Sequence, residues 1–173
     1  MTNIVLVIGP SGVGKSTAIL HCESSGLLTG WRFLDLDDLV AQENGCSAGE
    51  LLLKVGNDEF FNRCKSAADN ATQSLMENYI IVVGAGTLLS CMAIDWIRNH
   101  CSVLITAEEY ECYRRDKGRA GVERTVYQYN KSEFSEVRKA IYNSATFTIN
   151  TTNMTLDLTA RILADISNIL VSN

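Results

Sequence analysis

The 173-residue sequence predicts an α/β fold, with three layers built around a five-stranded parallel sheet. Five short runs rich in Val, Ile and Leu alternate with longer segments of helical spacing. Most of the runs are continuously apolar, which is typical of strands buried on both faces, and their alternation with helices indicates βαβ crossovers. Strands are predicted over residues 3–8, 31–34, 79–83, 102–106 and 146–149. Helices are predicted over residues 15–24, 39–44, 48–55, 58–76, 88–99, 107–117, 132–144 and 156–171.

Composition and charge narrow the class of protein. Hydrophobic residues make up 46% of the chain and charged residues 20%, as in an ordinary globular protein, and we expect one domain over residues 1–173. The net charge of −5 disfavours a nucleic-acid binder. Six scattered cysteines without a Cys-x-x-Cys pair disfavour a zinc site and indicate reduced thiols. With no secretory leader and no membrane-length apolar run, we expect a cytoplasmic protein with no obligate protein partner.

The first predicted strand is followed by a phosphate-binding motif. Residues 9–16 read Gly-Pro-Ser-Gly-Val-Gly-Lys-Ser and match G-x-x-x-x-G-K-[ST] in full, between a strand and a helix. Glycines let the backbone approach phosphate oxygens, the lysine reaches the β- and γ-phosphates, and the serine hydroxyl can ligate Mg²⁺. The motif therefore predicts nucleotide-phosphate binding by Gly9, Ser11, Gly12, Val13, Gly14, Lys15, Ser16 and Thr17.

Carboxylates gather where the second strand ends. Asp35 and Asp37 can point the same way if the chain stays extended, so one can hold Mg²⁺ and the other can accept a proton from a hydroxyl. Asp37 or Asp38 can also cap the next helix, and we expect Asp38 to be that cap.

A basic segment over about 114–126 is punctuated by Gly118 and Gly121 and suggests a flap over anions. Arg115 and Arg119 are its candidate ligands, whereas we expect Arg124 to be solvated.

On these motifs the chain resembles the shikimate kinase family over most of its length. The resemblance implies that Asp35 assists Mg²⁺, that Asp37 contacts the acceptor hydroxyl, and that Arg119 closes over the phosphates. It implies strand order 2-3-1-4-5, a lid at 114–126, and a loop near the adenine at 150–153. ATP and Mg²⁺ are the implied cofactors, with a small hydroxyl compound as substrate.

The acceptor-side residues depart from the family's pattern. Phe61 stands at the position of a substrate-binding arginine, and the family's three glycines become Gly84, Ala85 and Gly86. Arg138 keeps the Arg-x-x-x-Tyr spacing of the family's second substrate arginine, although a surface salt bridge would explain it equally well. We therefore expect phosphoryl transfer to an altered acceptor.

Other functions stay open at this point. The chain can be shikimate kinase proper, or a degenerate ATP-binding member without metabolite kinase activity. The phosphate loop also resembles that of guanylate kinase, but the arginine- and proline-rich GMP site is missing, since Pro10 is the sole proline. A GTP-driven switch is disfavoured because the chain has no Asp-x-x-Gly switch segment.

Overall fold

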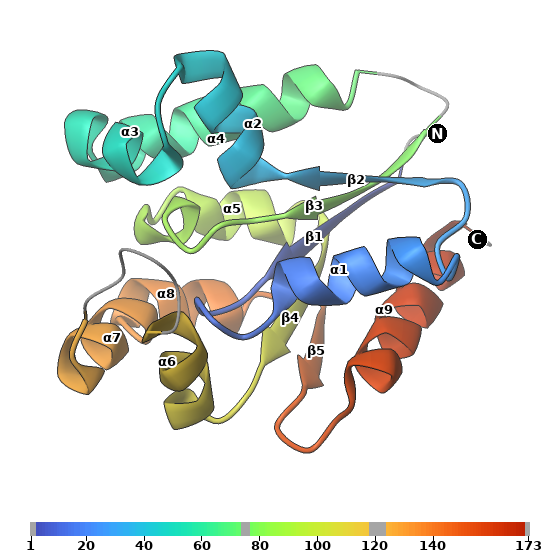
Figure 1. The fold of residues 1–173 in the computed structure, drawn as a ribbon. Coiled ribbons are helices and arrows are strands. Elements are labelled where there is room, and N and C mark those ends of the chain that lie inside the picture. Colours follow the sequence, from blue (N-terminus) through green and yellow to red (C-terminus); the bar gives the residue numbers. More distant parts are fainter. Residues whose placement is uncertain (1–2, 74–76, 118–123, 172–173) are drawn as a thin grey trace.

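The structure, a computed structural model, describes residues 3–73, 77–117 and 124–171. Five strands form one parallel sheet in the order β2-β3-β1-β4-β5, as expected (Figure 1). They are β1 (Ile4–Ile8), β2 (Trp31–Asp35), β3 (Asn78–Val82), β4 (Cys101–Thr106) and β5 (Phe147–Asn150). Together with helices on both faces, this is the three-layer α/β/α arrangement of a P-loop kinase fold.

The connections between strands are helical. They contain α1 (Lys15–Ser24), α2 (Leu36–Asn44), α3 (Ala48–Val55), α4 (Asn57–Ala71), the 3₁₀ turn η1 (Thr87–Leu89), α5 (Ala93–Arg98), α6 (Glu109–Lys117), α7 (Val126–Glu133), α8 (Glu136–Tyr142) and α9 (Leu156–Val171). No helix in the described ranges is long and apolar enough to cross a membrane.

Two hydrophobic cores lie on opposite faces of the sheet. Successive side chains of a strand point to opposite faces, so Val5 and Val7 of β1 enter one core and Leu6 and Ile8 the other. The first core is covered by α1 and α9, which pack against each other (Figure 1). The second is covered by α4, α5 and α8. The continuously apolar strands are therefore explained by burial on both faces.

Several predicted elements need correction. The helix expected over 88–99 is divided into η1 and α5, and the one expected over 132–144 is divided near Phe134, where α7 ends before α8 begins. The sequence pattern predicts no helix over residues 126–131, but these residues belong to α7. The helix expected from residue 39 begins at Leu36, directly after β2. Residues 74–76 of the expected long helix lie outside the described ranges.

Candidate functional site

A cavity of about 440 Å³ lies at the carboxyl ends of β1, β2 and β3, where open α/β sheets bind ligands. Three segments that follow these strands form it: the phosphate loop, the start of α2, and the Gly84–Ala85–Gly86 turn. Side chains from the segment between β4 and β5, Arg124 and Arg138 among them, complete the wall. The fold thus brings the two expected halves of a phosphotransfer site together.

The phosphate loop has the backbone shape that anion binding requires. Gly12 and Gly14 have φ of 79° and 100°, and a Cβ at Gly12 would collide with the carbonyl oxygen of Cys112 on α6. Gly14 is also the N-cap of α1, and among described residues no side chain caps that end. The first amides of α1 are therefore directed at the cavity without a side-chain cap, an arrangement that suits a phosphate group.

Lys15 is buried and its ammonium group lies against its own loop. Its Nζ donates to the carbonyl oxygens of Gly9, at 2.8 Å, and of Pro10, at 3.1 Å. These bonds hold the charge at the mouth of the loop, where the phosphates of a nucleotide would lie.

Ser16 and Asp35 form a pair of oxygen ligands beside the loop. Ser16 Oγ donates to Asp35 Oδ2 at 3.1 Å, while Asp35 Oδ1 accepts from the Asp37 backbone amide at 3.1 Å. Asp35, rather than Asp38, is therefore the N-cap of α2, because the helix starts as soon as β2 ends. Mg²⁺ prefers such hard oxygens and keeps several waters, so a hydroxyl and one carboxylate fit it. Among described residues, no group of three His, Cys, Asp or Glu side chains forms a larger metal site.

Asp37 lies in the first turn of α2 and faces the turn after β3. A Cβ built on Gly84 would collide with the Asp37 carboxyl group, so glycine permits this approach. Both residues line the cavity. Asp37 thus lines the same cavity as the phosphate loop and lies against the turn after β3.

The far wall of the cavity is apolar. It is formed by Leu52 of α3, Phe60 of α4 and Leu89 of η1. Phe61, expected here, instead packs in the core against Trp96, with ring centroids 6.0 Å apart at 77°. Adjacent helical positions differ by about 100°, so Phe60 faces the cavity and its neighbour does not.

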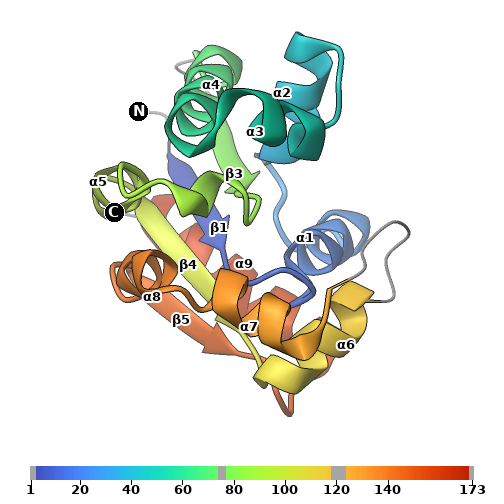
Figure 2. The ribbon, with the colours of Figure 1, turned by 90° about the vertical axis from the view of Figure 1, so that its left-hand side faces the viewer.

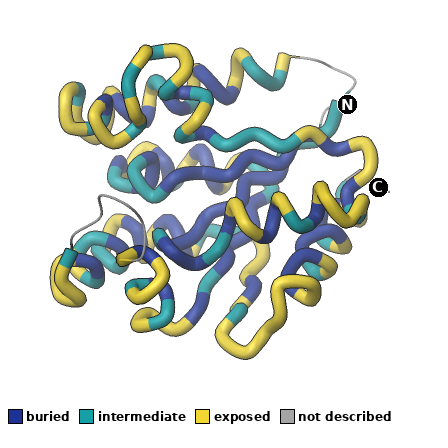
Figure 3. Tube along the Cα trace, in the orientation of Figure 1, coloured by how far each residue is buried: buried dark blue, intermediate teal, exposed yellow. Residues whose placement is uncertain are grey.

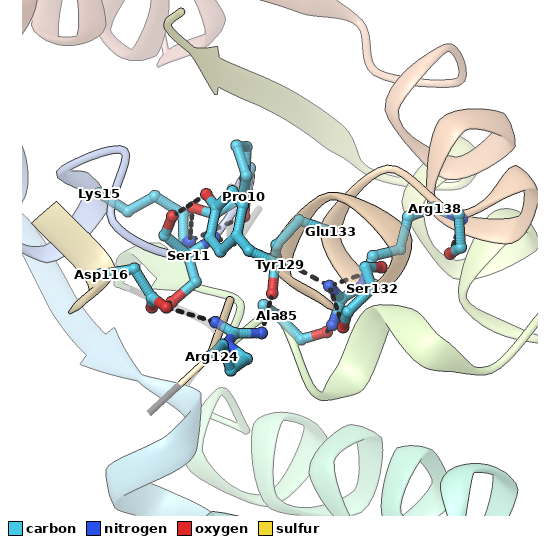
Figure 4. Close-up of polar contacts among 12 residues, drawn as sticks. Pro10, Ser11, Lys15, Ala85, Asp116, Arg124, Tyr129, Ser132, Glu133 and Arg138 are labelled. Atoms are coloured by element: carbon cyan, nitrogen blue, oxygen red, sulfur yellow. Dashed lines mark hydrogen bonds and ion pairs between the residues drawn. The ribbon is translucent and has the colours of Figure 1, made fainter. Parts of the chain in front are cut away.

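Four charged side chains form a buried charge cluster: Asp116, Arg124, Glu133 and Arg138 (Figure 4). Arg124 Nη2 lies 2.6 Å from Asp116 Oδ2, and its Nη1 lies 3.0 Å from Glu133 Oε1. Arg138 Nη1 lies 2.8 Å from Glu133 Oε2. The expectation that Arg124 is solvated was wrong, since it is held between two buried carboxylates.

The guanidinium of Arg124 stays charged in this cluster. Burial lowers the pKa of Arg124, but its hydrogen bonds with Asp116 and Glu133 outweigh that effect and raise the pKa above its ordinary value.

The buried charge cluster is bonded to the phosphate loop through Ser11. The Ser11 backbone amide donates to Glu133 Oε2 at 3.1 Å, and its hydroxyl donates to Asp116. The hydroxyl of Tyr129 donates to the Ser11 carbonyl, and burial raises the pKa of Tyr129, which keeps this donor protonated. Figure 2 shows α6 and α7, which carry these groups, beside the loop between β1 and α1.

The cluster also reaches the other side of the cavity. Arg138 Nη2 donates to the carbonyl oxygen of Ala85, and Arg138 Nη1 donates to the carbonyl oxygen of Ser132 at 3.0 Å. Arg138 is thus a buried residue bonded to protein groups, not part of a surface salt bridge.

A second cavity of about 440 Å³ lies on the opposite side of the phosphate loop. Val13 and Thr17 of the loop, Arg115 of α6 and Thr151 after β5 contribute to its wall. Thr151 belongs to the loop 150–153, which we expect to lie near the adenine. This loop and the phosphate loop therefore line the same cavity. Arg119 lies outside the described residues.

Sequence reasoning missed Asp116, Glu133, Arg124 and Tyr129. A signal existed only for α7, the helix that carries Tyr129 and Glu133: Thr125 and Gln128 form a capping box, with Gln128 N donating to Thr125 Oγ1 at 3.2 Å. The charge pairing itself joins helices that are not contiguous in sequence, and it has no local signature.

Taken together, the fold and the site define a P-loop phosphotransferase, with a phosphate loop, a neighbouring hydroxyl–carboxylate pair and an adjoining cavity. The family model described as Shikimate kinase matches residues 11–167, and the chain belongs to that family. Membership makes it an ATP-dependent phosphotransferase with a hydroxyl group as acceptor.

Individual relatives agree with this assignment. The chain is 27% identical over 161 residues to a shikimate kinase from Caldanaerobacter subterraneus subsp. tengcongensis, covering 91% of each protein. Among solved structures, shikimate kinase from Acinetobacter baumannii in complex with shikimate is 25% identical with a TM-score of 0.68, over 99% of this chain and 93% of that one. Shikimate kinase from Bacteroides thetaiotaomicron has a TM-score of 0.71 at 19% identity, over 95% and 97% of the two chains, and it supports the fold.

Proposed function

We propose that the chain transfers the γ-phosphoryl group of Mg²⁺-ATP to a hydroxyl of a small molecule whose binding site is altered relative to that of shikimate kinases. The main support for this proposal is that one cavity next to the phosphate loop is lined by Lys15, Ser16, Asp35 and Asp37. Mg²⁺ would neutralise phosphate charge between Ser16 and Asp35. Lys15 would balance charge that develops on the transferred group, and Asp37 would orient the acceptor hydroxyl and accept its proton.

Arginines would support the same charge. We assign this role to Arg119 from the family resemblance. Arg124 is a second candidate for the same role because it lines the cavity. Arg115 would lie along the nucleotide in the second cavity. Gly84, Ala85 and Gly86 would border the acceptor.

The donor side is tested by Lys15→Ala. Because Lys15 is the cation that the loop itself holds, we expect turnover to fall by at least about 10²–10³-fold. A coupled ADP-release assay measures this, and Lys54→Ala, an exposed position on α3, is the matched control. Unchanged activity in Lys15→Ala would sink the mechanism.

The acceptor side is tested by Asp37→Asn. The amide keeps the shape of the carboxylate but cannot take a proton, so we expect kcat to fall by about 10²–10⁴-fold. The affinity for ATP, measured by calorimetry, should stay within about two-fold, since Asp37 is placed on the acceptor side. Loss of ATP binding in step with kcat would instead make Asp37 part of the donor site.

Shikimate kinase proper is a second candidate. It is favoured by the Acinetobacter baumannii relative, solved in complex with shikimate, and by Arg138 in the cavity wall. An ADP-release assay over shikimate, gluconate, other polyols and nucleosides decides between the candidates. Efficient turnover of shikimate would establish the second one, and no turnover of any compound would favour a degenerate ATP-binding protein.

A further inference from the structure

Among the described residues, the wall of the first cavity carries no surplus positive charge. Its described wall contains three basic side chains, Lys15, Arg124 and Arg138, and three acidic ones, Asp35, Asp37 and Glu133. A fourth carboxylate, Asp116, lies directly behind Arg124. We propose that the acceptor is a hydroxyl compound without a carboxylate or other anionic group, and that Glu133 sets this selectivity. This inference rests on the proposed function and specifies its substrate class.

Both terminal nitrogens of Arg138 are engaged by protein groups. Nη1 binds the Glu133 carboxylate and the carbonyl oxygen of Ser132, and Nη2 binds the carbonyl oxygen of Ala85. The side chain is 3% exposed, and its Nε is buried without a hydrogen-bond partner among described atoms. A ligand carboxylate needs two parallel N–H groups for a bidentate contact. A ligand carboxylate that used Nη1 and Nη2 together would have to displace Glu133 and Ala85, and the Nε edge of the guanidinium is buried in the protein.

Glu133 is held too firmly to be displaced easily. Its carboxylate, 2% exposed, accepts from Arg138, from Arg124 and from the Ser11 amide, at 2.8, 3.0 and 3.1 Å. An incoming anion that took over these donors would leave Glu133 charged, buried and unpaired, which is strongly unfavourable. Glu133 therefore acts as an internal anion at the position where a ligand carboxylate would otherwise pair with both arginines (Figure 4).

Arg124, whose side chain is 29% exposed, is also paired with carboxylates. Its Nη2 is paired with Asp116 at 2.6 Å and its Nη1 with Glu133. Arg124 is thus paired with Asp116 and Glu133, and Arg138 is paired with Glu133, which the two arginines share. An anionic acceptor would add a like charge beside Glu133 and Asp37, which disfavours its binding.

The rest of the wall, as far as the structure describes it, does not supply a cation either. Leu52, Phe60 and Leu89 form this part of the wall. Arg63, which lies on α4 together with Phe60, is bonded to Glu59 at 2.9 Å and to Asn44 at 2.7 Å. This wall suits the carbon skeleton of a small molecule, while Asp37 is placed for its hydroxyl. The chemistry therefore fits an uncharged polyhydroxy compound or another neutral alcohol.

The test compares compounds that differ only in charge. Shikimate is set against its carboxamide, and gluconate against sorbitol, in the ADP-release assay and in calorimetric titration of the nucleotide-bound protein. We expect the neutral member of each pair to have at least a ten-fold higher kcat/KM or affinity. A preference for the carboxylate in either pair would overturn the inference.

Removing the charge of Glu133 tests whether this residue causes the selectivity for uncharged acceptors. Glu133→Gln should release Arg138 and raise shikimate affinity at least ten-fold, while the affinity for the carboxamide changes little. Glu133→Asp is the matched control, because it keeps the charge and should not gain carboxylate binding. If Glu133→Gln does not fold by circular dichroism, Asp116→Asn, which frees Arg124, takes its place. A folded neutral variant that gains no affinity for shikimate contradicts the inference.

The outcomes separate this inference from the proposed function. ATP binding without turnover of any compound would contradict the proposed function, and the carboxylate affinities of the variants would still decide the role of Glu133. Turnover that prefers a carboxylate would confirm the kinase and overturn the selectivity.

Discussion

At the scale of single residues, the contact between Gly84 and Asp37 determines where the acceptor-side carboxylate lies. Gly84 leaves room for this carboxylate because a Cβ there would collide with it. We expect Gly84→Ala to cost about 1–3 kcal/mol of stability by overpacking, lowering the melting temperature by about 2–4 °C per kcal/mol. Turnover should fall while ATP affinity is kept, because the displaced group is on the acceptor side. Thermal melts and the ADP-release assay measure the two effects.

A double-mutant cycle isolates that contact. In an Asp37→Ala background the collision partner is gone, so Gly84→Ala should cost much less than in the wild type. An equal loss of stability in both backgrounds would mean that the alanine methyl group collides with a group other than Asp37.

Residue-level prediction from sequence is possible where the chemistry is local. The phosphate loop is contiguous in the chain, so Lys15 and Ser16 could be assigned from spacing alone. Glu133 and Asp116 could not, because an acidic residue on a polar helix is usually solvated, and only the tertiary fold brings them between two arginines. Phe61 was misplaced for a related reason: its rotation on α4 decides whether it faces the cavity, and two adjacent phenylalanines give no preference.

At the scale of elements, the junction of β2 and α2 gives Asp35 two tasks. It caps α2 through the Asp37 amide and accepts from Ser16 with its other oxygen. We expect Asp35→Asn to leave stability nearly unchanged, since asparagine is an equally good N-cap, but to weaken Mg²⁺-dependent turnover by about 10- to 100-fold. Asp35→Ala should lose both functions, with about 1 kcal/mol less stability.

The measurements are a Mg²⁺ titration of turnover and thermal melts of both variants. Asp35→Asn with wild-type dependence on Mg²⁺ would show that Asp35 only caps the helix.

Strands were easier to predict than helices. The central strands β1, β3 and β4 are apolar runs whose burial on both faces leaves a continuous pattern, whereas the edge strands β2 and β5 are partly exposed. The α7 helix, Val126–Glu133, is short and polar, so it lacks the periodic apolar stripe that identifies a helix in sequence. Its stability instead comes from a capping box at Thr125 and from Tyr129, which is buried against the phosphate loop. Such support depends on contacts between distant segments.

At the scale of the molecule, the sheet separates two cores that each contain buried thiols. The buried stretches of the chain lie mainly along the central strands and on the helix faces toward them (Figure 3). Cys22 and Cys112 lie in the core under α1 and α9, and Cys64 lies in the core under α4. Burial raises the pKa of Cys22 and of Cys64 to about 11. At pH 7 about one in ten thousand of these thiols would be ionised, and neither is accessible to a reagent. Cys91, in contrast, is exposed.

Thiol labelling can therefore show whether the two layers unfold together. We expect a disulfide reagent to modify Cys91 quickly in the native protein, and Cys22 and Cys64 only through opening of the fold. Because both cores share the same central strands, their labelling should give the same free energy of opening, equal to the global value from denaturant melts. Mass spectrometry of labelled peptides measures each site, with Cys91→Ser removing the fast background. Labelling of Cys64 at a lower free energy than Cys22 would contradict two-state unfolding, and would show that the α2–α4 layer opens by itself on the side that bears the acceptor cavity.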